Sequence, residues 1–223
     1  MPGLKLILDF LYKKVSKKLV NYVGDVVVYT TTDRKAEHFE VRRRIIQEAQ
    51  NQIENILKDH RYTRVLVAGH SLGSVIAYDT LNRLHTTHDG GEGYKKLRGL
   101  ITFGSPLDKI AFFFRQQTRK EYYVRRQILD HLHCFKVQDL SPEEDPVKIV
   151  DKVSHNLEDI KWINFYDPED PVSGHLDFYK IEGEDNIQLD MGEDWGVAHV
   201  AYWEHKPMYD MILETFFERS DVV

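Results

Sequence analysis

The sequence predicts an α/β fold in which a mostly parallel sheet is flanked by helices. Short apolar runs rich in β-branched residues alternate with longer segments of helical periodicity, which is the pattern of βαβ units. The chain has 223 residues, of which 42% are hydrophobic and 30% are charged, so it can bury a sizeable core. No internal repeat or low-complexity tract divides it. These observations predict one domain over residues 1–223.

The first helical segment covers residues 4–22. Its apolar side chains recur every three or four residues, and lysines occupy the other face. Gly24 can end this helix. We interpret the segment as a helix packed on a sheet with a solvated lysine face, and the alternative is peripheral contact with a membrane surface.

The remaining elements follow in alternation. Apolar runs predict strands at residues 25–30, 64–69, 98–103 and 161–166, with a weaker one at 186–189. Helical patterns occur at about residues 35–58, 72–84, 109–132 and 207–219, and a loop is expected at 85–94. Because open parallel sheets place function at the carboxyl ends of their strands, the chemistry should lie in the loops that follow them.

Several function classes are disfavoured by composition. The formal net charge of −6 argues against nucleic-acid binding, which needs a basic surface. No run approaches the roughly 20 apolar residues of a membrane-spanning helix. The single cysteine, Cys134, cannot form a disulfide within the chain and favours a reducing, cytoplasmic compartment. His131, His133 and Cys134 lack a second ligand cluster, so neither a metal nor another cofactor is expected.

Residues 69–73, Gly-His-Ser-Leu-Gly, match the pattern Gly-x-Ser-x-Gly. The match follows an apolar strand directly and opens an apolar helix, which is the setting of a nucleophile elbow. Ser71 is therefore the candidate nucleophile, and the two glycines are expected to let strand and helix approach closely. The N–H of Leu72 at the helix start is the candidate oxyanion donor. The alternative is a structural or phosphate-binding turn, although the lysine of a Walker-type loop is absent.

A serine nucleophile needs a base and an acid, expected in the order serine, acid, histidine. Carboxylates cluster immediately after the strand at 161–166, at the edge of the sheet expected to carry Ser71. Asp170 is the first candidate because Asp-Pro-Val has the character of a turn leaving the sheet. Asp167 is the alternative acid, and Glu169 and Asp177 follow.

His199 is the candidate base among eleven histidines. It lies after the last predicted strand and before the C-terminal helix, in apolar and aromatic surroundings suited to a partly desolvated imidazole. His205 is the fallback. His70, next to the nucleophile, is expected to point away from it and is not assigned the role of the base.

These motifs in this order resemble the lipase/esterase branch of the α/β-hydrolase superfamily. The resemblance rests on residues 69–73, 102–107 and 170–172 and on His199 with Tyr202 and Trp203. It implies an enzyme that hydrolyses carboxylic esters, often lipid or acyl esters, without a cofactor. It assigns the nucleophile to Ser71, the acid to Asp170, the base to His199 and one oxyanion donor to Leu72.

The front of the chain departs from this family. No apolar strand precedes Asp25, and no His-Gly pair is present to supply the second oxyanion donor. The sequence therefore predicts an N-terminally reduced α/β-hydrolase-like domain or a piece of a longer protein.

Residues 109–133 lie where caps and lids are commonly inserted in this superfamily. Phe113 and Tyr122 are candidates to line an acyl-binding site, and a core-facing helix is an equally supported interpretation. Two other functions remain open. One is a thioesterase or acyltransferase with the same triad, and the other is a non-catalytic binding or scaffolding domain.

Overall fold

The computed structural model describes residues 37–87, 92–116, 160–179, 181–194 and 197–217, without the side chains of 37–39, 85–87, 92 and 112–116. The chain divides into two compact units, Met1–Ile46 and Gln47–Val223. The described part of the first unit is the beginning of helix α2 (Glu37–Lys58). All other described elements belong to the second unit. The predicted helix at 4–22 and strand at 25–30 lie outside the described residues, and the single domain over 1–223 stays a prediction.

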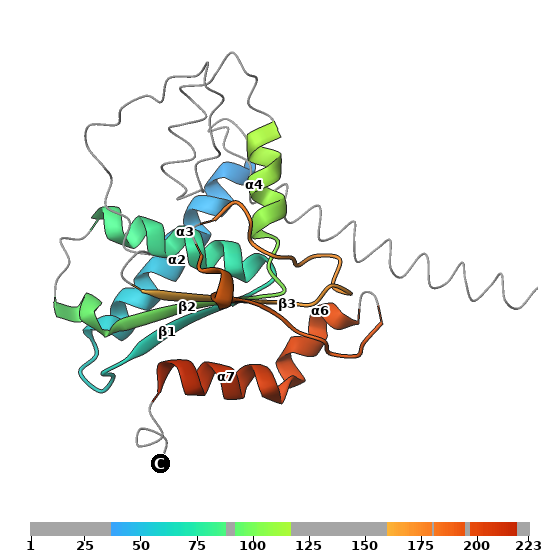
Figure 1. The fold of residues 1–223 in the computed structure, drawn as a ribbon. Helices are drawn as coiled ribbons and strands as arrows, with labels where there is room; N and C mark the ends of the chain where they lie inside the picture. The colour runs from blue at the N-terminus through green and yellow to red at the C-terminus, as the bar shows by residue number, and fades with distance from the viewer. Residues whose placement is uncertain (1–36, 88–91, 117–159, 180, 195–196, 218–223) are drawn as a thin grey trace, which may run out of the picture. The chain divides into compact units, whose positions relative to one another are not determined.

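A four-stranded parallel sheet forms the centre of the second unit (Figure 1). Its strands are β1 (Val65–His70), β2 (Leu97–Phe103), β3 (Lys161–Tyr166) and β4 (Asn186–Gln188), in the order β1-β2-β3-β4. Each neighbouring pair is parallel. The predicted α/β fold class is thereby confirmed, and each strand lies within one residue of its predicted position. Because all four strands run the same way, the loops that follow them meet at one edge of the sheet.

Helices connect and follow the strands. They are α3 (Leu72–Thr87), α4 (Leu107–Gln116), α6 (Ala198–Ala201) and α7 (Lys206–Phe216), with 3-10 turns η1 (Glu92–Lys96), η4 (Gly183–Asp185) and η5 (Tyr202–Glu204). The predicted loop at 85–94 is wrong at both ends. Helix α3 continues through Thr87 because no glycine or proline occurs before Gly90, and η1 begins at Glu92. Helix α4 begins two residues earlier than predicted, directly after Pro106.

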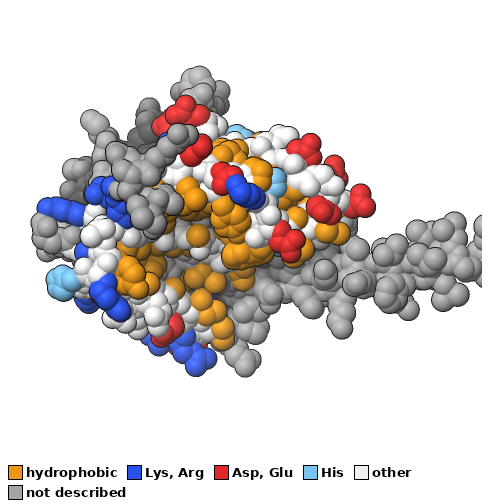
Figure 2. Space-filling view, turned by 90° about the horizontal axis from the view of Figure 1, so that it is seen from below, with side chains coloured by type: hydrophobic (Ala, Val, Ile, Leu, Met, Phe, Trp, Pro, Cys, Tyr) orange, Lys and Arg blue, Asp and Glu red, His pale blue; other side chains and the backbone are white. Residues whose placement is uncertain are grey.

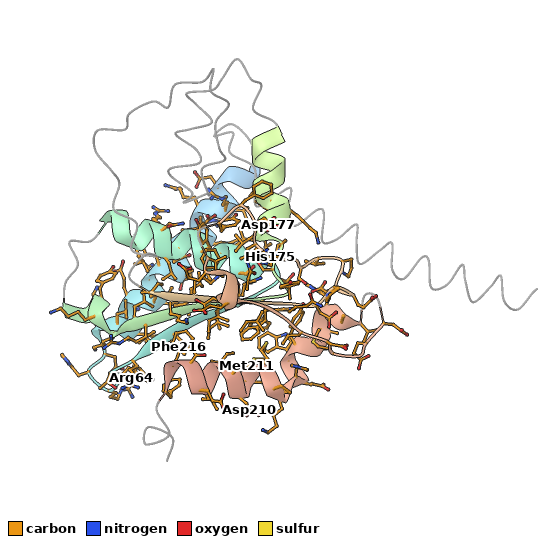
Figure 3. The ribbon with its side chains drawn as sticks, viewed as in Figure 1. Arg64, His175, Asp177, Asp210, Met211 and Phe216 are labelled. Carbon is orange, nitrogen blue, oxygen red and sulfur yellow. The ribbon has the colours of Figure 1, made fainter. Side chains whose placement is uncertain are left out.

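The two faces of the sheet bury different side chains. On one face, Ile101, Phe103, Ile163 and Phe165 form a cluster that includes Met208 of α7. Figure 3 shows Met211 and Phe216 of α7 directed to the sheet and Asp210 directed away from it, as expected of an amphipathic helix.

The opposite face packs against α3. The Tyr78 ring lies 5.2 Å from that of Trp162 and 5.1 Å from that of Tyr179. Figure 1 shows α3 and α7 on opposite sides of the sheet. The sheet is therefore covered on both faces, as parallel sheets require.

A buried amide fixes the loop that leaves β3. Asn164 is fully buried, accepts a hydrogen bond from Thr102 Oγ1 at 2.8 Å and donates to Asn186 Oδ1 at 2.9 Å. The same amide also donates to the Gly174 carbonyl at 3.2 Å. The loop from residue 167 to residue 176 is thus tied back to the centre of the sheet.

Within the described ranges, no helix combines the length and apolarity needed to cross a bilayer. Seen from below in Figure 2, hydrophobic side chains gather in the middle of the face, with lysine and arginine side chains toward one end. Exposed basic residues lie at or before the starts of strands, among them Arg61, Arg64, Lys95 and Arg98.

Helix α7 provides a matched pair for testing the core. Met208 is fully buried beneath the sheet, whereas Leu213 on the same helix is 42% exposed. Met208→Ala should lower the free energy of unfolding by about 2–5 kcal/mol because it removes buried volume. Leu213→Ala should lower it by about 1 kcal/mol or less. Urea unfolding followed by far-UV circular dichroism measures both, and equal losses would contradict this packing.

Candidate active site

The turn between β1 and α3 has an unusual backbone. Ser71 has φ of 55°, and it is the one non-glycine residue with positive φ among the described residues. Such a conformation is uncommon for a residue with a Cβ and persists only where its surroundings impose it. The N–H of Ser71 donates to the Phe103 carbonyl at 3.1 Å, so the parallel ladder with β2 continues into the turn.

One flanking glycine explains how the turn fits. A Cβ at Gly69 would lie 2.5 Å from Ser74 Cα and 2.6 Å from the Gly73 carbonyl oxygen, so strand and helix touch backbone to backbone there. The expectation for the second glycine is wrong, because a Cβ at Gly73 would meet no atom within 4 Å. Gly73 points away from the strand, and close approach does not require it.

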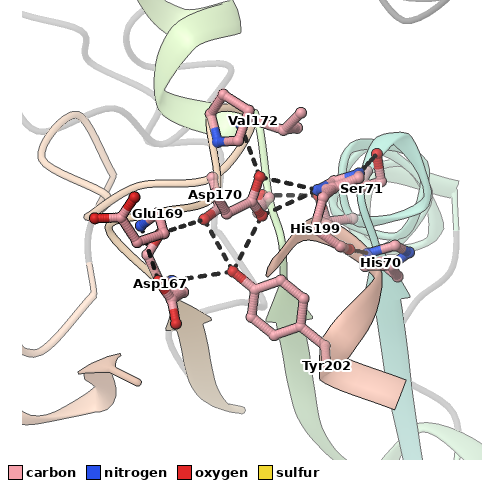
Figure 4. A network of polar contacts seen from close by, with 12 residues as sticks. His70, Ser71, Asp167, Glu169, Asp170, Val172, His199 and Tyr202 are labelled. Atoms are coloured by element: carbon pink, nitrogen blue, oxygen red, sulfur yellow. Dashed lines mark hydrogen bonds and ion pairs between the residues drawn. The ribbon is translucent and has the colours of Figure 1, made fainter. Parts of the chain in front are cut away.

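The structure brings three of the predicted residues together at the carboxyl edge of the sheet (Figure 4). His199 Nε2 lies 3.0 Å from Ser71 Oγ. His199 Nδ1 lies 3.1 Å and 3.0 Å from the two carboxylate oxygens of Asp170. One imidazole therefore bridges a hydroxyl and a carboxylate, an arrangement in which a proton can pass from oxygen to nitrogen.

Asp170 is buried and well supplied with donors. Its side chain has no exposed area, and it accepts the Val172 N–H at 2.8 Å and the Tyr202 hydroxyl at 3.1 Å. Burial acts to raise the pKa of this carboxyl, but the hydrogen bonds and charge of His199 and these other donors outweigh burial and hold the pKa below its usual range. The carboxylate therefore stays ionised at neutral pH.

The other predicted acids lie elsewhere. Asp167 is also buried, but its two oxygens accept the N–H groups of Glu169 at 2.8 Å and Met191 at 2.9 Å, so it closes the turn after β3. Asp177 pairs with His175 at 2.8 Å. Glu169 is exposed. Asp167 and Asp177 thus have other partners, and Asp170 is the carboxylate described in contact with His199.

His205, the fallback base, is the residue before α7 and makes a backbone bond to the Tyr202 carbonyl at 3.2 Å. His199 instead lies in α6, a four-residue helix that the sequence pattern did not indicate. This helix continues directly into η5.

Tyr202 was missed as a site residue by sequence reasoning. It is fully buried, and its hydroxyl donates to Asp170, accepts the Asp167 N–H at 3.0 Å and lies 3.0 Å from Ser173 Oγ. Burial, followed by the charge of Asp170, raises the pKa of this phenol above its usual value. Its position three residues after His199 was the available signal, since residues so spaced share a helix face.

His70 makes a contact that the sequence did not indicate. Its Nε2 lies 2.7 Å from the carbonyl oxygen of His199, and its ring lies 4.8 Å from the His199 ring. The expectation that its side chain points away from Ser71 stays a prediction, and that expectation took no account of the helix that returns over this strand end.

Leu72 is the first residue of α3. The N–H groups of a first helical turn have no partner within the helix, and the positive end of the helix dipole lies there. This position suits the predicted oxyanion role, which stays a prediction. The expected lack of a second donor loop concerns residues that lie outside the described part of the chain.

Helix α4 opens the predicted cap segment and is joined to the acid-bearing loop. Lys109 Nζ donates to the Pro171 carbonyl at 2.6 Å and to the Ser173 carbonyl at 3.0 Å. Burial lowers the pKa of Lys109, while Asp170 and Asp108 oppose that effect. Phe113 lies in α4 with its side chain outside the description, and Tyr122 lies outside the described residues, so their predicted contact with an acyl group stays a prediction.

No group of three or more histidine, cysteine, aspartate or glutamate side chains suited to a metal ion occurs in the portion of the chain that the structure describes. His131, His133 and Cys134 fall outside that portion.

Comparison with protein families identifies one family that matches this chain. A family model described as "Lipase (class 3)" matches residues 5–131, more than half of the chain. The match contains Ser71 and the turn around it and ends before Asp170 and His199. Comparison with curated proteins and with solved structures gave no match.

The backbone contact at Gly69 predicts a sharp difference between the two glycines. Gly69→Ala should destabilise the protein by about 1–3 kcal/mol through overpacking and distort the Ser71 turn. Gly73→Ala should leave stability within about 0.5 kcal/mol, because its Cβ meets no described atom. Thermal unfolding of the two variants beside the wild type measures this, and equal effects would contradict the close approach at Gly69.

The low pKa of Asp170 predicts a pH-dependent contribution to stability. An unfolded aspartate takes up its proton near pH 3.9, before the folded one does. The contribution is therefore complete above about pH 5 and is lost as the pH falls through the lower folded pKa. The stability gap between wild type and Asp170→Asn should be constant near neutrality and close below about pH 4.

Urea unfolding between about pH 3 and pH 7 measures this gap. Asp210→Asn, which alters an exposed carboxylate on α7, is the control and should change stability little at any pH. A gap for Asp170→Asn that stays constant down to about pH 3 would contradict the prediction.

Proposed function

This chain belongs to the class 3 lipase family, and from that premise we propose that it hydrolyses carboxylic esters through Ser71, His199 and Asp170. The family makes it a lipase-like hydrolase in general terms. The specific mechanism is supported above all by one observation, the continuous contact of hydroxyl, imidazole and buried carboxylate at 3.0 Å and 3.0 Å.

The proposed reaction begins at Ser71. Its Oγ attacks the ester carbonyl carbon as its proton passes to His199 Nε2, and the carbonyl oxygen takes the negative charge. His199 then gives the proton to the departing alcohol oxygen, which leaves an acyl-serine. Water attacks the acyl carbon, again with His199 as base, and releases the carboxylic acid and the free serine.

The surroundings favour the charges that develop in these steps. Asp170 is ionised and accepts from Nδ1, so Nε2 of neutral His199 is left as the acceptor for the serine proton. The positive end of α3 behind Ser71, with the Leu72 N–H, is placed to stabilise the oxyanion. A single oxyanion donor of this kind contributes about a hundredfold to a thousandfold in rate.

The surface around His199 supports lipid or acyl esters without negative charge as the substrate class. Val197, the N-cap of α6, is followed at intervals of three residues by Val200 of α6 and Trp203 of η5, and the three are 49%, 52% and 58% exposed. Exposed carboxylates lie nearby in sequence at Glu193, Asp194 and Glu204. An apolar ridge with acidic neighbours favours neutral apolar esters and disfavours anionic ones. We include peripheral membrane contact and a cytoplasmic location in the proposal, the latter on the single cysteine.

A fluorophosphonate probe tests the proposal directly, because it reacts covalently with an activated serine. The wild type should be labelled, and Ser71→Ala should abolish labelling. His199→Ala should slow labelling and hydrolysis of p-nitrophenyl esters by about 10⁴-fold or more. Thr215→Ala, which removes an exposed hydroxyl from α7, should behave as the wild type.

Four outcomes would contradict parts of the proposal. Folded wild type that takes no label indicates the non-catalytic binding domain. Labelling at Ser71 with faster turnover of acyl thioesters than of oxygen esters indicates a thioesterase. Transfer of the acyl group to an alcohol instead of water indicates an acyltransferase. Equal turnover of neutral and anionic esters of one chain length would overturn the substrate class alone.

A further inference from the structure

A second histidine lies directly behind the proposed base. His70 is the last residue of β1 and precedes Ser71 in the chain. Its Nε2 lies 2.7 Å from the His199 carbonyl oxygen, in contact with the backbone of the base and not with its ring nitrogens (Figure 4). The proposed mechanism gives His70 no task.

The chemistry of this contact fixes the proton. A carbonyl oxygen only accepts, so His70 Nε2 must carry the hydrogen and donate it. The contact therefore selects the Nε2–H tautomer in the neutral ring. It also joins the strand end that carries the nucleophile to the helix that carries the base.

The ring is held by aromatic neighbours. Phe103 stacks on it at 5.2 Å with 25° between the planes, and Trp203 meets it edge-on at 5.5 Å. Gly104 leaves room for it, since a Cβ there would lie 3.0 Å from two atoms of the His70 ring. These contacts leave the imidazole little freedom to turn away from the His199 carbonyl.

The helix that carries the base is short. Helix α6 has four residues and no side-chain hydrogen bond at its N-cap, and its start is held by the fully buried Ala198 and by the N–H groups of Val197 and Ala198, which donate to the Asp194 carbonyl at 2.9 Å and 3.2 Å. Tyr202 anchors its C-terminal side through Asp170. The hydrogen bond from His70 is made to the backbone of His199 itself, so it acts directly on the position of the imidazole.

We propose that His70 is a positioning residue which, as a neutral imidazole donating from Nε2 to the carbonyl of His199, holds the base against Ser71. This proposal rests on the proposed function for its effect on rate. The nucleophile and the base are then both held at the end of β1, which keeps the 3.0 Å contact between Ser71 Oγ and His199 Nε2 in place.

Neutrality matters because of the charge that forms next to His70. When His199 becomes an imidazolium, a second cation at 4.8 Å would oppose it. Burial lowers the pKa of His70, and the charge of His199 lowers it further, while the hydrogen bond to the His199 carbonyl and the charge of Asp170 act in the opposite direction. His70 therefore remains a neutral donor at neutral pH, and protonation in acid would weaken the site.

Two variants at one position separate the hydrogen bond from the bulk of the ring. His70→Gln keeps a side-chain N–H donor, and His70→Leu removes it at similar volume. The rate of fluorophosphonate labelling should fall about 10- to 100-fold in His70→Leu, the range typical of losing a partner that orients a metal-binding histidine. In His70→Gln, the labelling rate should regain at least about half of that loss on a logarithmic scale. His175→Gln, which changes an exposed histidine paired with Asp177, is the control and should label at the wild-type rate.

Folding is measured in the same samples, so that a structural effect is recognised. Equal midpoints of thermal unfolding for the Leu and Gln variants, with different labelling rates, support positioning. A labelling rate that follows the folded fraction alone, or folded His70→Leu that labels at the wild-type rate, overturns it.

Nuclear magnetic resonance gives a test that does not depend on activity. Long-range ¹⁵N–¹H correlation should show His70 as the neutral Nε2–H tautomer at pH 7, and the Nδ1–H tautomer or an imidazolium would overturn the assignment. The Nδ1 proton between His199 and Asp170 should give a low-field resonance that is retained in His70→Gln and broadened or lost in His70→Leu. If the wild type takes no probe, the proposed function fails, and these spectra still decide whether His70 holds His199. An unchanged resonance in His70→Leu rejects that role.

Discussion

The parallel alignment of four strands is the constraint on which the site depends. Because all of them end at one edge of the sheet, residues more than a hundred positions apart in the chain meet there. The ladder continues past the strands, from the Ser71 N–H to Phe103 and from the Gly104 N–H to Phe165. Backbone hydrogen bonds thus hold the serine, the start of the acid loop and the strand beneath the base in register.

A buried polar network then determines which carboxylate faces the imidazole. Asp170 and Asp167 are three residues apart in one turn, and both are buried. The two differ in their donors, because Asp167 is committed to backbone N–H groups of Glu169 and Met191 whereas Asp170 is reached by His199 and Tyr202. A buried carboxylate needs hydrogen-bond donors to remain charged. The donors available to each carboxylate oxygen therefore determine which side chain contacts His199.

The elbow illustrates how a motif and its physical reasons can differ. Gly69 is required because its backbone touches that of Ser74, and Ser71 carries the strained φ that turns the chain from strand to helix. Gly73 belongs to the same sequence pattern, yet a Cβ added there would meet no described atom within 4 Å. A sequence pattern does not distinguish between its positions. The structure shows at which positions a side chain would clash with neighbouring atoms.

The sequence by itself determined the alternation of strands and helices, the parallel sheet, and Ser71 at a strand–turn–helix junction, because these follow from local periodicity and from glycine spacing. It also ranked Asp170 and His199 first, since each follows the end of a predicted strand. Only the tertiary structure decided that Asp170 rather than Asp167 contacts His199, that the Tyr202 hydroxyl bonds to both Asp167 and Asp170, and that His70 reaches the backbone of the base. Those contacts join segments separated by 29 to 129 positions, and the direction of a side chain across such a separation is set by packing, which local sequence does not encode.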